Sequence, residues 1–164
     1  MNIIAIDHVN IQIPKSGVED ALEFYSNILG FKAEQIDEYK KGVRTLFTFR
    51  LGENAVLHIR PIDDFSPPDK SNYDHFALIV DIPISEVKSK LSDANMPIMR
   101  EGNPLGARGR APAIYLQDPF GYIIEIKEKS DYLFLILFQS KSFFENKTTI
   151  YLYQFPIKLY MRIL

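Results

Sequence analysis

The feature that most constrains this chain is an internal repeat. The pair Asp7-His8 recurs as Asp74-His75, and Leu57-His58-Ile59 is matched by Ile124-Glu125-Ile126, both at an offset of 67 residues (75 − 8 and 125 − 58). Within each copy the two matched segments lie 50 residues apart (58 − 8 and 125 − 75). A repeat of this kind predicts two copies of one structural unit.

The first copy spans residues 1–62 and begins with a strand pattern over residues 3–13. Apolar side chains then recur at helical spacing until Gly30, which is a typical helix stop. Turn residues separate three further strands, which the pattern predicts over residues 31–38, 43–51 and 55–61. The predicted order is βαβββ.

The second copy spans residues 73–128 and follows a linker over residues 63–72 that contains two prolines. The pattern predicts a strand over 73–80, a helix over 85–94, a strand over 96–101, a loop over 102–112, and strands over 113–117 and 122–127. Asp118-Pro119-Phe120-Gly121 joins the last two strands and is a strong turn signal. The order is again βαβββ, and an apolar extension over residues 129–164 follows it.

Composition excludes several classes of function. With 46% hydrophobic and 24% charged residues, the chain of 164 residues can bury a core. A formal net charge of −2 and the lack of a basic stripe argue against nucleic-acid binding, and no apolar run reaches the length of about 18 residues that a membrane span needs. The absence of cysteine excludes disulfides, thiolate metal sites and a cysteine nucleophile. The N-terminus lacks the basic segment of a signal peptide, so we expect a cytoplasmic protein.

The repeat places three histidines and one acid at equivalent positions of the two copies, namely His8, His58, His75 and Glu125. These three are all the histidines of the chain. Histidine is the commonest neutral metal ligand, and glutamate is a usual anionic companion. If the copies pack around a pseudo-two-fold axis, the four side chains converge, and we predict a divalent metal site. Taken alone, Glu125 is better explained as a residue on the solvent face of a strand.

The chain resembles the vicinal oxygen chelate superfamily, which includes glyoxalase I, fosfomycin-resistance transferases, methylmalonyl-CoA epimerase, extradiol dioxygenases and bleomycin-resistance proteins. The resemblance covers residues 3–128. It rests on Ile6-Asp7-His8-Val9, on Ala21-Leu22-Glu23-Phe24-Tyr25-Ser26-Asn27-Ile28-Leu29-Gly30-Phe31, on Asp74-His75-Phe76-Ala77-Leu78, and on Asp118-Pro119-Phe120-Gly121-Tyr122-Ile123-Ile124-Glu125.

The resemblance implies an α+β fold in which paired βαβββ modules form a cupped eight-stranded mixed sheet, often completed across a dimer. It also implies metal ligands at His8, His58, His75 and Glu125. Glyoxalase I typically carries Glu at the position of His58, so this chain departs from that pattern. Fosfomycin transferases and extradiol dioxygenases use two histidines and one glutamate, matched here by His8, His75 and Glu125. In that case His58 is an extra ligand or a residue beside the ligands.

The function implied by the resemblance is that of a metal-dependent lyase or isomerase of the glyoxalase I type. Its substrate would be a small α-oxygenated compound such as a hemithioacetal, its cofactor a divalent ion (Ni, Co, Zn, Mn or Fe), and Glu125 both a ligand and the candidate catalytic proton shuttle. The alternatives are a fosfomycin-type thiol transferase, a ferrous extradiol dioxygenase and a metal-free drug-binding protein. Arg44, Arg108 and Arg110 are candidates to bind an anionic substrate, and solvated surface arginines are an equal alternative.

We also expect a homodimer whose interface helps to form the site, because a βαβββ module exposes open strand edges. The modules pair within one chain or between chains, since ten linker residues span up to about 33 Å. The extension over residues 129–164 packs on the sheet or at the dimer interface, or has no evolved role and is an aggregation hazard, or forms a lid.

Overall fold

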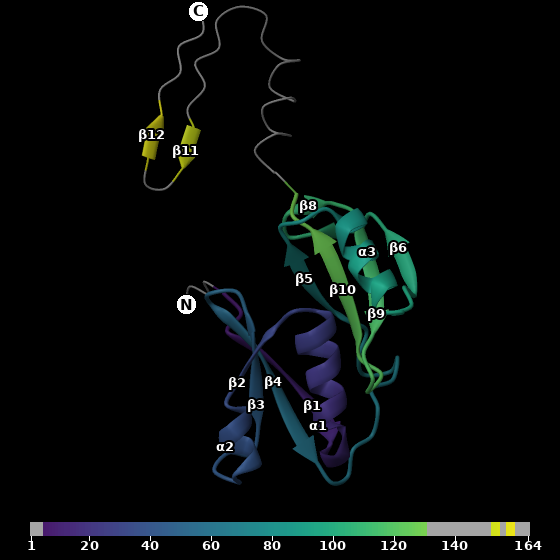
Figure 1. The fold of residues 1–164 in the computed structure, drawn as a ribbon. Helices are drawn as coiled ribbons and strands as arrows, with labels where there is room; N and C mark the ends of the chain where they lie inside the picture. The colour runs from purple at the N-terminus through teal and green to yellow at the C-terminus, as the bar shows by residue number, and fades with distance from the viewer. Residues whose placement is uncertain (1–4, 131–151, 155–156, 160–164) are drawn as a thin grey trace, which may run out of the picture.

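The computed structural model describes residues 5–130, 152–154 and 157–159, and two similar halves follow one another along the chain (Figure 1). The first half contains β1 (His8–Pro14), a continuous helical stretch of η1 (Lys15–Gly17), α1 (Val18–Ala21) and the π-helical η2 (Leu22–Ile28), then β2 (Lys32–Glu34), α2 (Ile36–Lys40), β3 (Phe47–Leu51) and β4 (Ala55–Ile62). The second half contains β5 (Phe76–Val80), α3 (Ile84–Asp93), β6 (Arg100–Gly102), β7 (Leu105–Gly106), β8 (Gly109–Arg110), β9 (Ala113–Gln117) and β10 (Ile123–Glu128).

The C-terminal extension contributes two short paired strands, β11 (Leu152–Gln154) and β12 (Ile157–Leu159). The rest of it beyond residue 130 lies outside the described residues, and so do the predictions for its packing.

Each half forms its own four-stranded mixed sheet with the same topology. The strand orders are β1-β4-β3-β2 and β5-β10-β9-β6. The first strand of each half pairs in parallel with the last, whereas the remaining pairs in both sheets are antiparallel. The predicted α+β class and βαβββ order are therefore confirmed. Within the described residues the two sheets stay separate, so one chain does not form the expected eight-stranded sheet, and β1 and β5 are edge strands.

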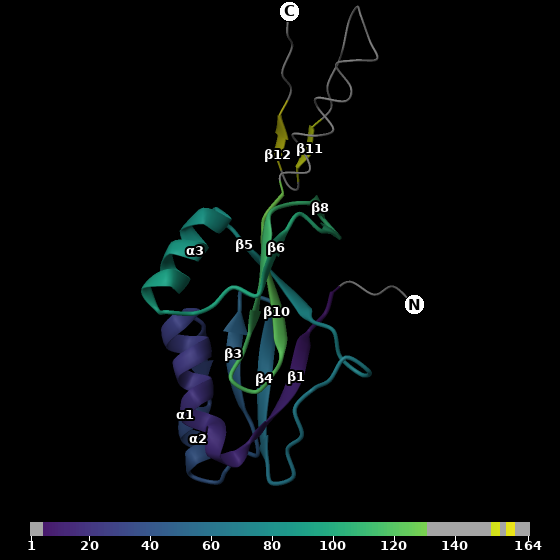
Figure 2. The ribbon, with the colours of Figure 1, turned by 90° about the vertical axis from the view of Figure 1, so that its right-hand side faces the viewer.

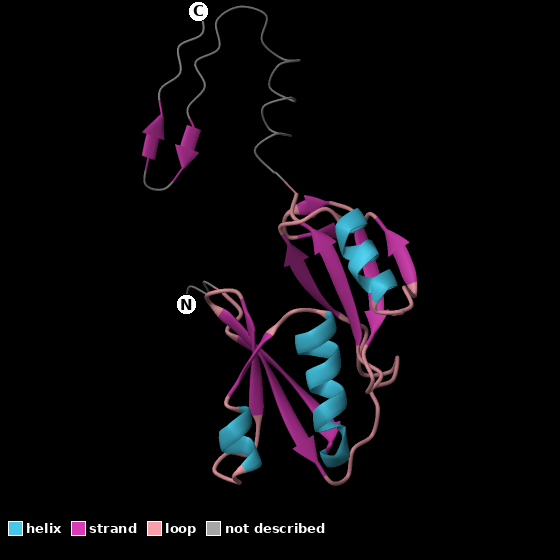
Figure 3. Ribbon diagram, viewed as in Figure 1, coloured by secondary structure: helices cyan, strands magenta, loops and turns pink. Residues whose placement is uncertain are grey.

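Several strands are shorter than expected; the one predicted over residues 96–101, for example, begins only at Arg100. Two segments also adopt a different structure (Figure 3). The strand expected over residues 31–38 ends at Glu34, because Gln35 adopts the left-handed conformation (φ 64°) and α2 begins directly after it. The loop expected over residues 102–112 contains the short β7–β8 hairpin. Neither difference alters the order of the strands that carry the predicted ligands.

The helices lie on one side of the two sheets (Figure 2). No helix in the described ranges is both long and apolar enough to span a membrane.

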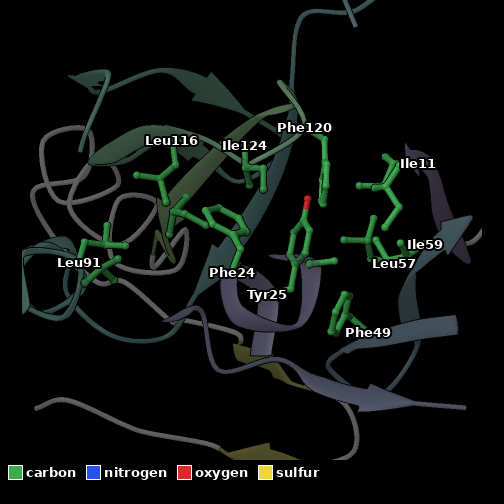
Figure 4. Close-up of a cluster of buried hydrophobic side chains, with 14 of the residues drawn as sticks. Ile11, Phe24, Tyr25, Phe49, Leu57, Ile59, Leu91, Leu116, Phe120 and Ile124 are labelled. Atoms are coloured by element: carbon green, nitrogen blue, oxygen red, sulfur yellow. The ribbon is translucent and has the colours of Figure 1, made fainter. Parts of the chain in front are cut away.

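A single hydrophobic cluster joins the two halves (Figure 4). Phe24 and Tyr25 on η2 are almost fully buried, and they pack with core residues of both sheets. Leu91 on α3 and Leu116 on β9 belong to the same cluster. Because the core is shared, the relative position of the two halves is set by packing as well as by the linker.

A buried hydrogen bond connects the first helix to the turn of the second half. The Tyr25 hydroxyl donates to Asp118 Oδ2 at 2.6 Å, and Asp118 Oδ1 accepts the N–H groups of Phe120 (2.9 Å) and Tyr122 (2.8 Å). Burial raises the pKa of Asp118, and burial together with the Asp118 carboxyl raises that of Tyr25 well above its usual range. The Asp-Pro-x-Gly turn is thus held from within the core as well as by its own sequence.

Gly17 in the first half lies against the Phe120 ring of the second half, and its replacement by alanine is expected to be destabilising. A Cβ at this position would come 2.5 Å from Cε1 of Phe120, which is 6% exposed. Overpacking of this kind costs about 1–3 kcal/mol. Urea unfolding of Gly17→Ala should show that loss, whereas Gly102→Ala, whose Cβ would meet nothing closer than 3.9 Å, should stay within about 1 kcal/mol of the parent. Equal midpoints for the two variants would contradict this contact.

Candidate metal site

The predicted ligands lie on the sheet faces opposite the shared core. Along β1, buried Ile11 and Ile13 alternate with exposed His8. Successive side chains of a strand point to opposite faces, so His8 and, on β4, His58 share the outer face of the first sheet. By the same alternation with Ile124, Glu125 lies on the outer face of the second sheet.

The first half contributes a pair of stacked imidazoles. The ring centroids of His8 and His58 lie 4.5 Å apart at an interplanar angle of 20°. His8 Nδ1 lies 2.6 Å from Asp7 Oδ1, which leaves its Nε2 available. Burial and then the nearby His8 lower the pKa of His58, and Arg44 acts in the same direction. A low pKa keeps the ring neutral at physiological pH, which is the form that binds metal ions.

The second half contributes a histidine and a carboxylate in direct contact. His75 Nε2 lies 3.1 Å from Glu125 Oε2, and Glu125 is only 5% exposed. His75 Nδ1 contacts Asp74 Oδ1, as His8 contacts Asp7 in the first half. The repeated Asp-His dipeptide therefore corresponds to a repeated contact that orients each imidazole, an arrangement typical of metal-binding histidines.

The charges around His75 favour a cation. Its two ring nitrogens face the carboxylates of Asp74 and Glu125, and the contact with His75 is the main cause that lowers the pKa of Asp74. A neutral imidazole has only one N–H, so its other nitrogen would point a lone pair at a carboxylate oxygen. A proton or a metal ion between Nε2 and Oε2 removes that repulsion. Mixed nitrogen and oxygen donors of this kind suit a divalent transition metal.

Tyr115 holds Glu125 in place, a role that was not predicted from the sequence. Its hydroxyl donates to Glu125 Oε2 at 2.7 Å, the same oxygen that His75 contacts. Burial and the Glu125 carboxylate raise the pKa of Tyr115, so the phenol stays protonated and remains a donor. Tyr115 is the register partner of Glu125 on β9. Only the strand pairing shows this relation, although the ten-residue spacing in a predicted hairpin was a usable signal.

Lys127 is a second residue missed at the sequence level. It is 4% exposed, and its Nζ donates to the carbonyl oxygens of Pro104 (2.7 Å) and Gly109 (2.8 Å). Those bonds hold the β7–β8 hairpin against β10. A Cβ on Gly106 would come 2.9 Å from Lys127 Nζ, so a side chain at this position would displace the ammonium group.

The three predicted substrate-binding arginines lie in different places. Arg110 Nη1 donates to the Asn103 carbonyl oxygen at 3.0 Å, within its own loop. Arg108 is exposed, and its carbonyl oxygen accepts a hydrogen bond from Ser130. Arg44 is exposed between α2 and β3, close enough to His58 to affect its pKa. Their role in binding a substrate stays a prediction.

The structure brings the four predicted ligands together as two pairs and not as one cluster. Over residues 5–130, no group of three or more histidine or acidic side chains is close enough to hold one ion. A cavity of about 820 Å³ opens between the halves, and its lining includes His8 and apolar side chains of β5 such as Phe76 and Ile79. Each half of a chain therefore presents half of the predicted ligand set.

Known proteins share this sequence pattern. Residues 5–126 match the family model described as Glyoxalase/Bleomycin resistance protein/Dioxygenase superfamily. Virulence protein STM3117 of Salmonella typhimurium is 30% identical over 134 residues, which are 78% of this chain and 86% of that protein. A lactoylglutathione lyase of Neisseria meningitidis serogroup A is 30% identical over 116 residues, which are 68% of this chain and 83% of that protein.

Solved structures agree with the fold. A glyoxalase family protein from Bacillus anthracis has a TM-score of 0.63 at 30% identity, covering 79% of this chain and 98% of that one. The crystal structure of virulence protein STM3117 also gives 0.63, at 24% identity, and covers 79% of this chain and all of that one (100%).

Proposed function

Given that this chain belongs to the Glyoxalase/Bleomycin resistance protein/Dioxygenase superfamily, we propose that it is a metal-dependent lyase or isomerase of the glyoxalase I type. Its substrate is a small α-oxygenated compound such as a hemithioacetal. The observation that carries this proposal is the pair of Asp-His contacts, one per half, with His58 and Glu125 beside them. The similarity to proteins named lactoylglutathione lyase supports the reaction type.

The side chains present fit a divalent ion. His8 and His75 each keep Nε2 for a metal because Asp7 and Asp74 contact their Nδ1 atoms, and the lowered pKa of His58 keeps a third imidazole neutral. Glu125 supplies the anionic donor. A bound ion of this class acts as a Lewis acid toward two neighbouring oxygens of a substrate.

Glu125 is the proposed catalytic residue, because it is the one carboxylate among the four. Tyr115 and His75 both contact its Oε2, and within the described chain its Oε1 accepts no hydrogen bond. In the isomerisation of a hemithioacetal, Oε1 takes the proton from the carbon that carries sulfur and returns it to the neighbouring carbon. The hydroxyl proton passes from the oxygen of the first carbon to the oxygen of the second, and the product is an α-hydroxy thioester. The hydrogen bond from Tyr115 fixes the position of the carboxylate, which lowers the entropic part of the barrier to proton transfer.

We further propose that the complete site is shared by two chains. Each chain presents the pair His8 and His58 on one sheet and the pair His75 and Glu125 on the other, and the edge strands β1 and β5 are open to a partner. A symmetric dimer that pairs the first half of one chain with the second half of the other brings the four ligands together twice.

Metal reconstitution tests the proposed activity. Protein stripped with a chelator and reloaded separately with nickel, cobalt, zinc or manganese should isomerise the hemithioacetal of methylglyoxal and glutathione with at least one ion, and stripped protein should not. Formation of the thioester is followed by its ultraviolet absorbance. Failure with all four metals would contradict the lyase function.

The same preparation separates the other functions of the superfamily. Oxygen uptake with a catechol and ferrous iron would indicate ring cleavage, and loss of thiol with fosfomycin would indicate thiol transfer. Drug binding that a chelator leaves unchanged would favour a metal-free binding protein.

A further inference from the structure

Arg100 shares one face of the second sheet with Tyr115 and Glu125. Arg100 on β6 is the register partner of Tyr115 on β9, and Tyr115 is the register partner of Glu125 on β10. Directly opposed residues of antiparallel strands point to the same face. The three side chains thus form a row across the sheet, away from the core.

The row brings a positive charge close to the proposed metal site. The guanidinium carbon of Arg100 lies 3.8 Å from the ring centroid of Tyr115, and the hydroxyl of that ring lies 2.7 Å from Glu125 Oε2. One phenol ring therefore separates the guanidinium from the carboxylate. Contact with an aromatic ring of this kind restricts where an arginine side chain lies.

Arg100 keeps N–H donors for an anion beyond those that contact Tyr115. It is exposed, and in the part of the chain that the structure describes it belongs to no ion pair. Asp74 is near enough for Arg100 to contribute to the lowering of its pKa, but that carboxylate is engaged by His75. The N–H donors of a guanidinium lie in its plane, so a group that rests on a ring keeps them available for bidentate binding of a carboxylate.

We infer that Arg100 determines specificity by binding a carboxylate of the substrate. The inference rests on the proposed function, since it places this carboxylate within reach of the two neighbouring oxygens that a metal at Glu125 would bind. The substrate class is then an α-oxygenated compound that also carries an acidic group, a few bonds from the chelating oxygens. Arg110, by contrast, donates within its own loop.

A matched pair of hydroxamates tests this inference. Succinic monohydroxamate and butyrohydroxamate offer the same two chelating oxygens on chains of equal length and differ in a terminal carboxylate or methyl. Calorimetry on the metal-loaded protein should show that the acidic ligand binds about 10-fold more tightly. In Arg100→Met this preference should disappear while butyrohydroxamate affinity and metal content stay unchanged. Arg100→Lys should keep part of the preference, because lysine retains the charge without the planar fork.

The control is Lys90→Met, which removes a charge from the exposed surface of α3 and should leave the preference intact. Unfolding midpoints of the variants check that the sheet is preserved. If the parent binds both ligands equally, or if Arg100→Met keeps the preference, Arg100 does not bind the carboxylate of the ligand and the inference is wrong. If neither hydroxamate binds the metal-loaded parent, the proposed function itself is wrong.

Discussion

Replacement of Glu125 by glutamine is expected to weaken divalent metal binding at least about 100-fold and to lower kcat/KM about 1,000-fold, roughly 4 kcal/mol. Glutamine keeps the shape of the side chain and can still accept the hydrogen bond from Tyr115. It loses the negative charge that attracts the ion and the oxygen that carries the proton. Metal content after dialysis and steady-state kinetics measure the two effects.

The same change should not destabilise the metal-free fold. Glu125 is 5% exposed, and a buried carboxylate is costly even beside an imidazole. The free energy of unfolding of Glu125→Gln should therefore equal or exceed that of the parent. Glu53→Gln makes the same chemical change in the exposed turn after β3 and should alter neither metal content nor stability. Parental metal content in Glu125→Gln would remove this residue from the ligand set.

The fold was predictable because its signals are local or repeated. The offset between His8 and His75 predicted two copies of one module, and the sheets follow the same order in both. The helix stop at Gly30 was also correct, since this residue has φ 76°. The segment 35–40 was not predictable in this way, because Gln35 has a positive φ and glutamine rarely adopts that conformation.

The candidate site was predictable only in part. Histidine and glutamate at repeat-related positions are recognisable as candidate ligands from their residue type. The roles of Tyr115 and Arg100 depend on which residues lie opposite them on neighbouring strands. Lys127 is similar, because its partners are main-chain oxygens of a loop that sequence patterns describe poorly. Register and loop conformation are tertiary properties, and the composition of a single strand does not encode them.

Whether the two pairs of ligands meet within one chain or between chains is open to a direct test. A double variant, His8→Ala with His58→Ala, lacks the ligands of the first half, and another, His75→Ala with Glu125→Gln, lacks those of the second half. Each variant alone should be inactive and should hold little metal. Co-expressed with different affinity tags and purified as the mixed dimer, they should regain about half of the parental activity and about one ion per dimer.

This recovery follows from the arrangement of the two pairs. In a mixed dimer that exchanges halves, one site receives both intact pairs and the other receives neither. If each chain instead closed its own site over the cavity lined by His8 and β5, every site would contain one damaged pair. Dimers of either variant with itself provide the matched controls. A mixed dimer without metal or activity, beside an active parent, would therefore assign the site to a single chain and require its halves to close on each other.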